Sequence, residues 1–153
     1  MRITIDFMKL LTTGSLGNFT GGETEEEIIN LIGQPEIYTP ERKSYPAFVI
    51  YGDLEFRLRK NKIETVVITL NNGTINMPNS IEIKNFNGGN ELTIDFIKGL
   101  LSENGVSWTL DSVMSDQYQA NYVSDKGVHF AFDLEESGVL TKIGIEYKLM
   151  ANS

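Results

Sequence analysis

Apolar residues recur at helical spacing in two well-separated segments of the chain. Residues 24–33 and 93–104 each begin with a threonine that can cap a helix, and each ends at a glycine or an Asn-Gly pair. The first segment is the better specified, because Thr24 and Glu27 form a capping box and three glutamates lie at the positive end of the helix dipole. The pattern therefore predicts one helix in each half of the chain.

The N-terminal segment fits two patterns. Ile3, Phe7 and Leu10 recur at helical spacing, whereas Ile3, Ile5 and Phe7 alternate as they would in a strand. We predict an N-terminal helix over residues 1–13 and keep the strand as the alternative.

Period-two alternation predicts strands in both halves of the chain. Leu54, Phe56 and Leu58, for example, should face the core while the residues between them face water. The predicted strands cover residues 47–51, 54–59, 63–70, 106–110, 117–123, 128–133 and 140–148.

The middle of the chain differs in composition. The segment from Asn71 to Asn90 contains seven asparagines and three glycines, which are typical of turns and loops. We expect an Asn-rich connector over residues 71–91, with one short strand at Ile81 and Ile83 as an alternative within it.

The two halves share one order of elements, a helix followed by strands. The offset between aligned positions grows only from 69 to 77 residues, so a few loop insertions account for it. The aligned positions are Thr24 with Thr93, Leu31-Ile32 with Leu100-Leu101, Tyr38-Thr39 with Trp108-Thr109, Leu54-x-Phe56-x-Leu58 with Val128-x-Phe130-x-Phe132, and Val66-x-Ile68-x-Leu70 with Ile143-x-Ile145-x-Tyr147. We predict an α+β fold in which two tandem helix-plus-antiparallel-strand repeats, residues 23–70 and 92–149, form one compact domain over residues 1–153.

Length and composition agree with a single globular domain. The chain has 153 residues, of which 41% are hydrophobic and 22% charged. The absence of cysteine excludes disulfides, thiolate metal sites and cysteine nucleophiles. Asp6 and Lys9 interrupt the apolar core that a signal peptide needs, and no apolar run approaches the roughly 18 residues of a membrane span. We therefore expect a cytoplasmic protein that does not bind membranes.

Charge narrows the class of partner. Acidic residues outnumber basic ones by 21 to 13, for a net charge of -8, and residues 71–153 hold 11 acidic against 5 basic side chains. Such a field repels the phosphates of nucleic acids and attracts basic proteins. We therefore expect no nucleic-acid partner and place a candidate partner-binding surface on six acidic residues: Asp111, Asp116, Asp125, Asp133, Glu135 and Glu136.

No segment carries a complete catalytic or cofactor motif. The glycine-rich stretch 14–22 lacks the Gly-Lys-Ser/Thr of a phosphate-binding loop, and the glutamates that begin at Glu23 would repel a phosphate, so we interpret it as a turn between helices. His129, the single histidine, is predicted on the outward face of its strand with no nucleophile motif beside it. We predict no catalytic residue, no metal ligand and no cofactor.

A basic cluster at Arg57, Arg59, Lys60 and Lys62 alternates outward on a predicted hairpin whose tight turn is Lys60-Asn61. Charged side chains on a solvated face protect a sheet from aggregation. We favour that role for the cluster, with phosphate binding as the alternative.

Three short stretches of the first half form a recognisable set: Gly21-Gly22-Glu23-Thr24, Leu31-Ile32-Gly33-Gln34-Pro35 and Tyr51-Gly52-Asp53-Leu54-Glu55-Phe56. Together they resemble small uncharacterised bacterial proteins, some of which are immunity proteins of polymorphic toxin systems. The resemblance covers mainly residues 14–70, and its motifs are a helix cap, a helix stop and a strand start. It implies a related fold, and it brings no catalytic motif.

These observations favour a non-enzymatic protein-binding module of a bacterial cytoplasm. The most specific form of this hypothesis is an immunity protein that binds and blocks a basic toxin, with association accelerated by electrostatic steering. The alternative is a small-molecule binder or enzyme with a pocket between the two repeats, near Tyr38, Trp108 and Tyr122. Tyr38 and Trp108 occupy matching places just after the two predicted helices, and we expect them to pack together across the repeat boundary. The third hypothesis is a homo-oligomeric structural protein, such as a homodimer, whose copies are joined by sheet edges.

Overall fold

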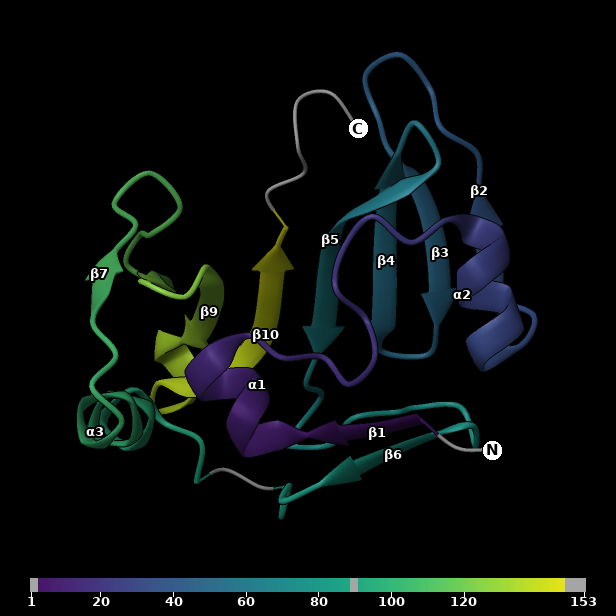
Figure 1. The fold of residues 1–153 in the computed structure, drawn as a ribbon. Helices are drawn as coiled ribbons and strands as arrows, with labels where there is room; N and C mark the ends of the chain where they lie inside the picture. The colour runs from purple at the N-terminus through teal and green to yellow at the C-terminus, as the bar shows by residue number, and fades with distance from the viewer. Residues whose placement is uncertain (1–2, 89–90, 148–153) are drawn as a thin grey trace.

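The computed structural model describes residues 3–88 and 91–147, and its main element is an eight-stranded antiparallel sheet (Figure 1). One half consists of β2 (Ile37–Thr39), β3 (Ala47–Tyr51), β4 (Leu54–Arg59) and β5 (Lys62–Thr69). The other half consists of β7 (Trp108–Leu110), β8 (Gln119–Ser124), β9 (Val128–Asp133) and β10 (Val139–Glu146). The strands lie in the order β2-β3-β4-β5-β10-β9-β8-β7, so the last strand of each half meets the other at the centre. The α+β class expected from the sequence is confirmed.

A capped helix precedes each half of the sheet, as predicted. Helix α2 (Glu25–Ile32) begins at the expected capping box, in which Thr24 Oγ1 accepts a hydrogen bond of 3.2 Å from the Glu27 amide. Helix α3 (Ile94–Glu103) begins at Thr93, whose Oγ1 accepts a bond of 3.3 Å from the Phe96 amide. With 10 residues, α3 is the longest helix in the described ranges, and none there is long and apolar enough to cross a membrane.

The N-terminal segment corrects the prediction of one helix over residues 1–13. Strand β1 (Ile3–Asp6) precedes helix α1 (Phe7–Thr13), and residues 1–2 lie outside the described part of the chain. Strand β1 pairs in parallel with β6 (Ile81–Lys84), which is the short strand considered within the Asn-rich connector. Residues 3–6 form a strand and not a helix because the distant strand β6 supplies hydrogen-bond partners for their backbone groups. Asp6 Oδ1 then caps α1 by accepting hydrogen bonds from the Met8 and Lys9 amides.

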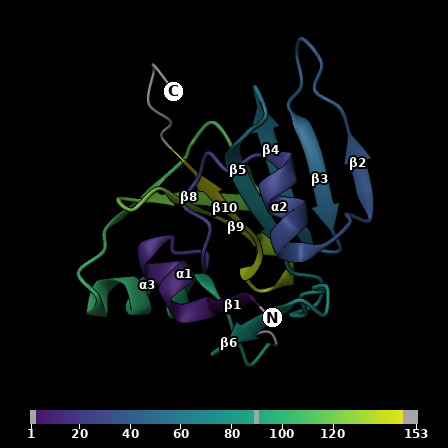
Figure 2. The same ribbon diagram turned by 45° about the vertical axis from the view of Figure 1, so that its right-hand side comes forward.

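The core lies between one face of the sheet and the helices. On that face, opposed residues such as Phe56 on β4 and Val66 on β5 are at most 1% exposed. Ile28 of α2 and Ile97 of α3 belong to the same buried cluster. Figure 2 shows α2 in front of β4 and α1 beside α3. The opposite face of the sheet carries polar side chains, including Lys142 on β10.

The centre of the sheet is regular in register. Val67 of β5 lies opposite Gly144 of β10. On either side of this pair, Ile68 lies opposite Ile143, and Val66 opposite Ile145. Three of the four pairs of corresponding strands also have equal lengths, with three residues in β2 and β7, six in β4 and β9, and eight in β5 and β10, whereas β3 has five and β8 has six.

The glycine-rich stretch 14–22 connects α1 to α2, as expected. The carboxylate of Glu23 folds back onto this stretch and accepts hydrogen bonds of 2.9 Å from the Thr20 and Gly21 amides. These amides are donors of the kind that a phosphate would need. The protein's own carboxylate therefore occupies them, which agrees with a structural turn.

Candidate functional site

Five of the six acidic residues proposed as a partner surface lie at one end of the second half of the sheet. The loop between β7 and β8 contains Asp111 and Asp116, while Asp133 ends β9 and is followed by Glu135 and Glu136. The two segments meet there, because the amide after Asp133 donates a hydrogen bond of 2.9 Å to the Tyr118 carbonyl. Five of the six predicted residues therefore lie in one region of the structure.

Asp125 lies apart from the other five acidic residues. It occupies the turn between β8 and β9, at the opposite end of these strands. There its Oδ2 accepts a hydrogen bond of 3.2 Å from the Ser107 hydroxyl. Asp125 cannot join the same contact surface as Glu135, because consecutive hairpin turns lie at opposite ends of a meander.

Two of the clustered carboxylates, Asp111 and Asp116, also fix the shape of the loop between β7 and β8. Asp111 Oδ1 accepts hydrogen bonds of 3.2 Å from the Val113 and Met114 amides. Asp116 Oδ1 accepts bonds of 2.8 and 2.9 Å from the Tyr118 and Gln119 amides. Such Asx turns hold a loop in one conformation while the charge stays at the surface.

Exposed apolar side chains lie among these carboxylates. The most exposed is Val113, at 90%. With it are four further apolar residues that are each at least 40% exposed: Leu110, Met114, Tyr118 and Leu134. We call these five side chains, with Asp111, Asp116, Asp133, Glu135 and Glu136 around them, the acid-rimmed patch. Sequence reasoning missed its apolar part, although Val113-Met114 between polar loop residues was an available signal.

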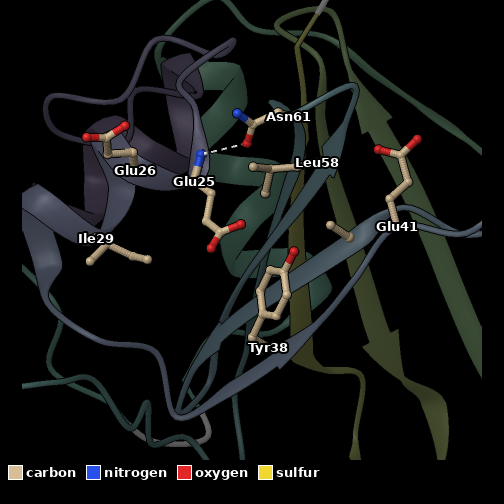
Figure 3. Close-up of a pocket in the computed structure, with 8 residues that line it drawn as sticks. Glu25, Glu26, Ile29, Tyr38, Glu41, Leu58 and Asn61 are labelled. Carbon is tan, nitrogen blue, oxygen red and sulfur yellow. Dashed lines mark hydrogen bonds between the residues drawn. The ribbon is translucent and has the colours of Figure 1, made fainter.

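A second acidic site lies between α2 and β2, in a pocket of about 500 Å³ (Figure 3). Glu25 of α2 points toward the hydroxyl of Tyr38, and Glu41 lies on the far side of that ring. Burial, followed by the charge of Glu25 and a hydrogen bond to it, raises the pKa of Tyr38 above its ordinary value. Ile29 and Leu58 add apolar walls. The pocket's negative field suits a cationic group.

The aromatic pocket expected near Tyr38, Trp108 and Tyr122 does not form. Trp108 stacks on Tyr122 at a centroid distance of 4.3 Å, but Tyr38 lies on β2, at the other edge of the sheet from β7. The expected packing of Tyr38 against Trp108 is therefore wrong, because the two halves join through β5 and β10. A different cavity spans the junction, between Thr69 of β5 and Lys142 of β10.

His129 lies on the open face of the sheet, as predicted. Its Nε2 is 3.6 Å from Glu146 Oε2 on the neighbouring strand, and its side chain is 37% exposed. Within residues 3–88 and 91–147, no three His, Asp or Glu side chains are grouped as metal ligands would be. Arg57 of the basic cluster is paired with Glu55 on the same face, at 2.6 Å.

A comparison of the chain with family models, curated proteins and solved structures found no match.

Proposed function

We propose that this chain is a non-enzymatic protein-binding module that contacts its partner through the acid-rimmed patch. The observation that carries the proposal is the exposure of five apolar side chains within one group of five carboxylates. Stable interfaces have an apolar centre and a polar rim, and a contiguous exposed apolar patch marks an interaction site. Val113, at 90% exposure, is the natural centre of the contact.

The charge of the rim specifies the partner. The five carboxylates lie on the same two loops as the apolar side chains, and the chain as a whole carries a net charge of -8. The complementary partner has basic residues around an apolar contact, and its approach is accelerated by electrostatic attraction. A toxin nuclease with a basic substrate cleft has this chemistry. We therefore include in the proposal that the module is a bacterial cytoplasmic immunity protein that covers such a cleft.

We also propose that the two halves are tandem repeats, residues 23–70 and 92–149. The sequence alignment equates Val66 with Ile143 and Ile68 with Ile145. If the halves are related by a twofold rotation, the rotation replaces each residue by its aligned counterpart, so the pair Ile68–Ile143 becomes the pair Ile145–Val66. Both of these pairs are found opposite each other in the sheet. The equal lengths of three of the four pairs of corresponding strands support the same proposal. A relative whose halves align in another register would contradict it.

The experiment that tests the binding proposal uses a photo-crosslinking amino acid at position 113. In cells of the natural host, crosslinking from position 113 should capture a basic protein that crosslinking from Leu31, an exposed apolar residue of α2, does not capture. The captured protein is then purified and titrated against the full chain. Val113→Asp should weaken its binding by about tenfold or more, as expected for a contact at the interface centre, while Leu31→Asp should leave it unchanged. Equal losses from both variants would refute the site.

A further inference from the structure

The open face of the sheet contains a trough where the two halves of the chain join. The trough encloses about 450 Å³, within the range of ligand sites. Its floor is a row of residues that lie opposite one another on four neighbouring strands: Thr69 of β5, Lys142 of β10, Ala131 of β9 and Asn121 of β8. The floor is deepest at Ala131, because its side chain is shorter than those of its neighbours Lys142 and Asn121.

A β-bulge shapes this floor. The register between β9 and β10 shifts between Leu140 and Lys142, so Thr141 is the extra residue. The Thr141 hydroxyl donates a hydrogen bond of 3.2 Å to the Ala131 carbonyl. The main-chain carbonyl of Thr141 accepts a hydrogen bond of 2.9 Å from the Leu70 amide. Bulges redirect neighbouring side chains, and they are enriched beside functional sites. Here both Thr141 and Lys142 line the trough.

Two loops that are held by hydrogen bonds form the walls. On one side, the turn after β5 is closed by reciprocal backbone bonds between Asn71 and Thr74 of 2.9 and 3.0 Å. On the other side, the loop between β7 and β8 is fixed to Asn121, whose amide donates a bond of 2.9 Å to Ser115 Oγ. This attachment places Met114 at the edge of the trough. Both walls are therefore built before any ligand arrives.

The trough continues into a second cavity of about 360 Å³, which shares Leu70, Asn72 and Thr141 with it. Asp133 and Glu136 of the acid-rimmed patch line this second cavity. The charges are thus separated along one groove, with Lys142 in the first cavity and two carboxylates in the second. Within the described residues Lys142 forms no ion pair, so its ammonium group is available to a ligand.

We propose that this groove binds an extended segment of the protein partner, with an acidic side chain on Lys142 and a basic side chain at Asp133 and Glu136. This inference rests on the proposed function, because Asp133, Glu136 and Met114 belong to both surfaces. The Asn72 and Gln119 side chains add amide donors and acceptors of the kind that match a peptide backbone. A segment of the partner therefore lies in the groove while its body covers the apolar centre of the patch.

The register sets the spacing of the two charges in the segment. Lys142 lies opposite Ala131, and Asp133 is two residues farther along β9 on the same face. Two residues of strand span roughly 7 Å, which is the distance between residues i and i+2 of an extended chain. The expected motif is therefore one acidic and one basic residue separated by a single residue.

Synthetic octapeptides test this inference with the full chain. Each carries Glu or Lys at two positions separated by one residue, in a common background of Ser, Thr and Val, and binding is followed by fluorescence anisotropy. Peptides with one Glu and one Lys should bind more tightly than those with two Glu, two Lys or two Gln. Lys142→Glu should weaken the mixed peptides by about tenfold, which corresponds to one charge-assisted contact, and should transfer the preference to peptides with two Lys. Lys98→Glu, at an exposed site on α3, is the matched control and should change nothing.

The outcomes separate this inference from the proposed function. Val113 does not line the trough, so Val113→Asp should weaken the captured partner but leave octapeptide binding intact. If no octapeptide binds, or if Lys142→Glu does not reverse the charge preference, the groove inference is wrong even where partner binding still depends on Val113. If a free amino acid competes as well as the octapeptides do, the ligand is a small molecule and the inference is overturned.

Discussion

The side-chain amide of Asn121 donates a hydrogen bond of 2.6 Å to the main-chain carbonyl of Met114. Asn121 lies on β8 in the floor of the trough, whereas Met114 belongs to the apolar part of the acid-rimmed patch. This hydrogen bond therefore helps to hold the loop that carries part of the patch against the floor of the trough. An exposed loop that is held in place before binding loses less conformational entropy in the complex.

Asn121→Ala should loosen this loop, because it removes the side-chain bond to Met114 and keeps the main-chain bond to Ser115. We expect a loss of about 1 kcal/mol in unfolding free energy, the usual contribution of one hydrogen bond, together with weaker binding of the octapeptides and of the captured partner. Asn104→Ala removes a comparable bond of 2.8 Å to the Leu100 carbonyl at the end of α3. Chemical denaturation should show similar losses for both variants, and only Asn121→Ala should affect binding. Unchanged binding by Asn121→Ala would show that the attachment is not needed.

Loss of the hydroxyl should have different effects at Tyr51 and Tyr147. The Tyr51 hydroxyl donates a hydrogen bond of 2.7 Å to the Gly33 carbonyl, whereas the buried hydroxyl of Tyr147 finds no hydrogen-bond partner among the residues that the structure describes. Tyr51→Phe should therefore lower the unfolding free energy by about 1 kcal/mol, while Tyr147→Phe should leave it unchanged or raise it. Thermal unfolding of the two variants decides this, and a larger loss for Tyr147→Phe would contradict the hydrogen-bond assignment.

The same tyrosines predict a loss of stability at high pH. Burial is the main reason that the pKa of each tyrosine is raised to about 12, and the charge of a nearby glutamate adds to it. The glutamate is Glu25 for Tyr51 and Glu23 for Tyr147. The folded state thus holds these protons more tightly than the unfolded state, in which the ordinary value is 10.0. The stabilisation is complete below pH 10 and is lost as the pH rises from 10 through 12. Denaturation midpoints across this range should fall, and Tyr147→Phe should flatten the decline.

A side chain at Gly21, in the glycine-rich turn, should clash with the Tyr147 ring and lower the stability of the fold. A Cβ atom there would lie 2.5 Å from the Tyr147 ring, and the residue has a φ of +92°. Gly105 has a φ of +69° with no atom within 4 Å of such a Cβ. Gly105→Ala should cost about 1 kcal/mol from backbone strain alone, and Gly21→Ala should cost clearly more. Equal losses in chemical denaturation would indicate that the Tyr147 ring moves aside without cost.

Local sequence signals were sufficient for helices α2 and α3 and for most strands. Thr24, Thr93 and the glycines that follow each helix act through neighbouring residues, so α2 and α3 could be predicted from short windows. Ile3 and Ile5 show the limit of such windows, because they belong to β1 only through the distant strand β6. Alternation also predicts which face of a strand is buried but not which strand lies beside it, and for this reason Tyr38 and Trp108 were wrongly expected to meet.

The candidate site could be predicted only in part. Acidic composition indicated the carboxylates, and five of the six lie together because the β7–β8 and β9–β10 connections, which are separated by the β8–β9 turn, lie at the same end of the sheet. The exposure of Val113 depends on how its loop folds, and alternation gives no information about it. The role assigned to Lys142 depends on the bulge after Leu140, which shifts the register by one residue and has no clear sequence signal.

The association rate constant of the captured partner tests the central claim most directly. It should be measured from low to physiological salt for the unmodified chain, for Glu135→Gln combined with Glu136→Gln, and for Asp95→Asn combined with Glu103→Gln on α3. We predict that the rate falls as salt rises, and that only the variant in the acid-rimmed patch both slows association and weakens its salt dependence. A rate that does not change with salt, or that responds equally to both variants, would contradict the claim that this patch receives a basic partner.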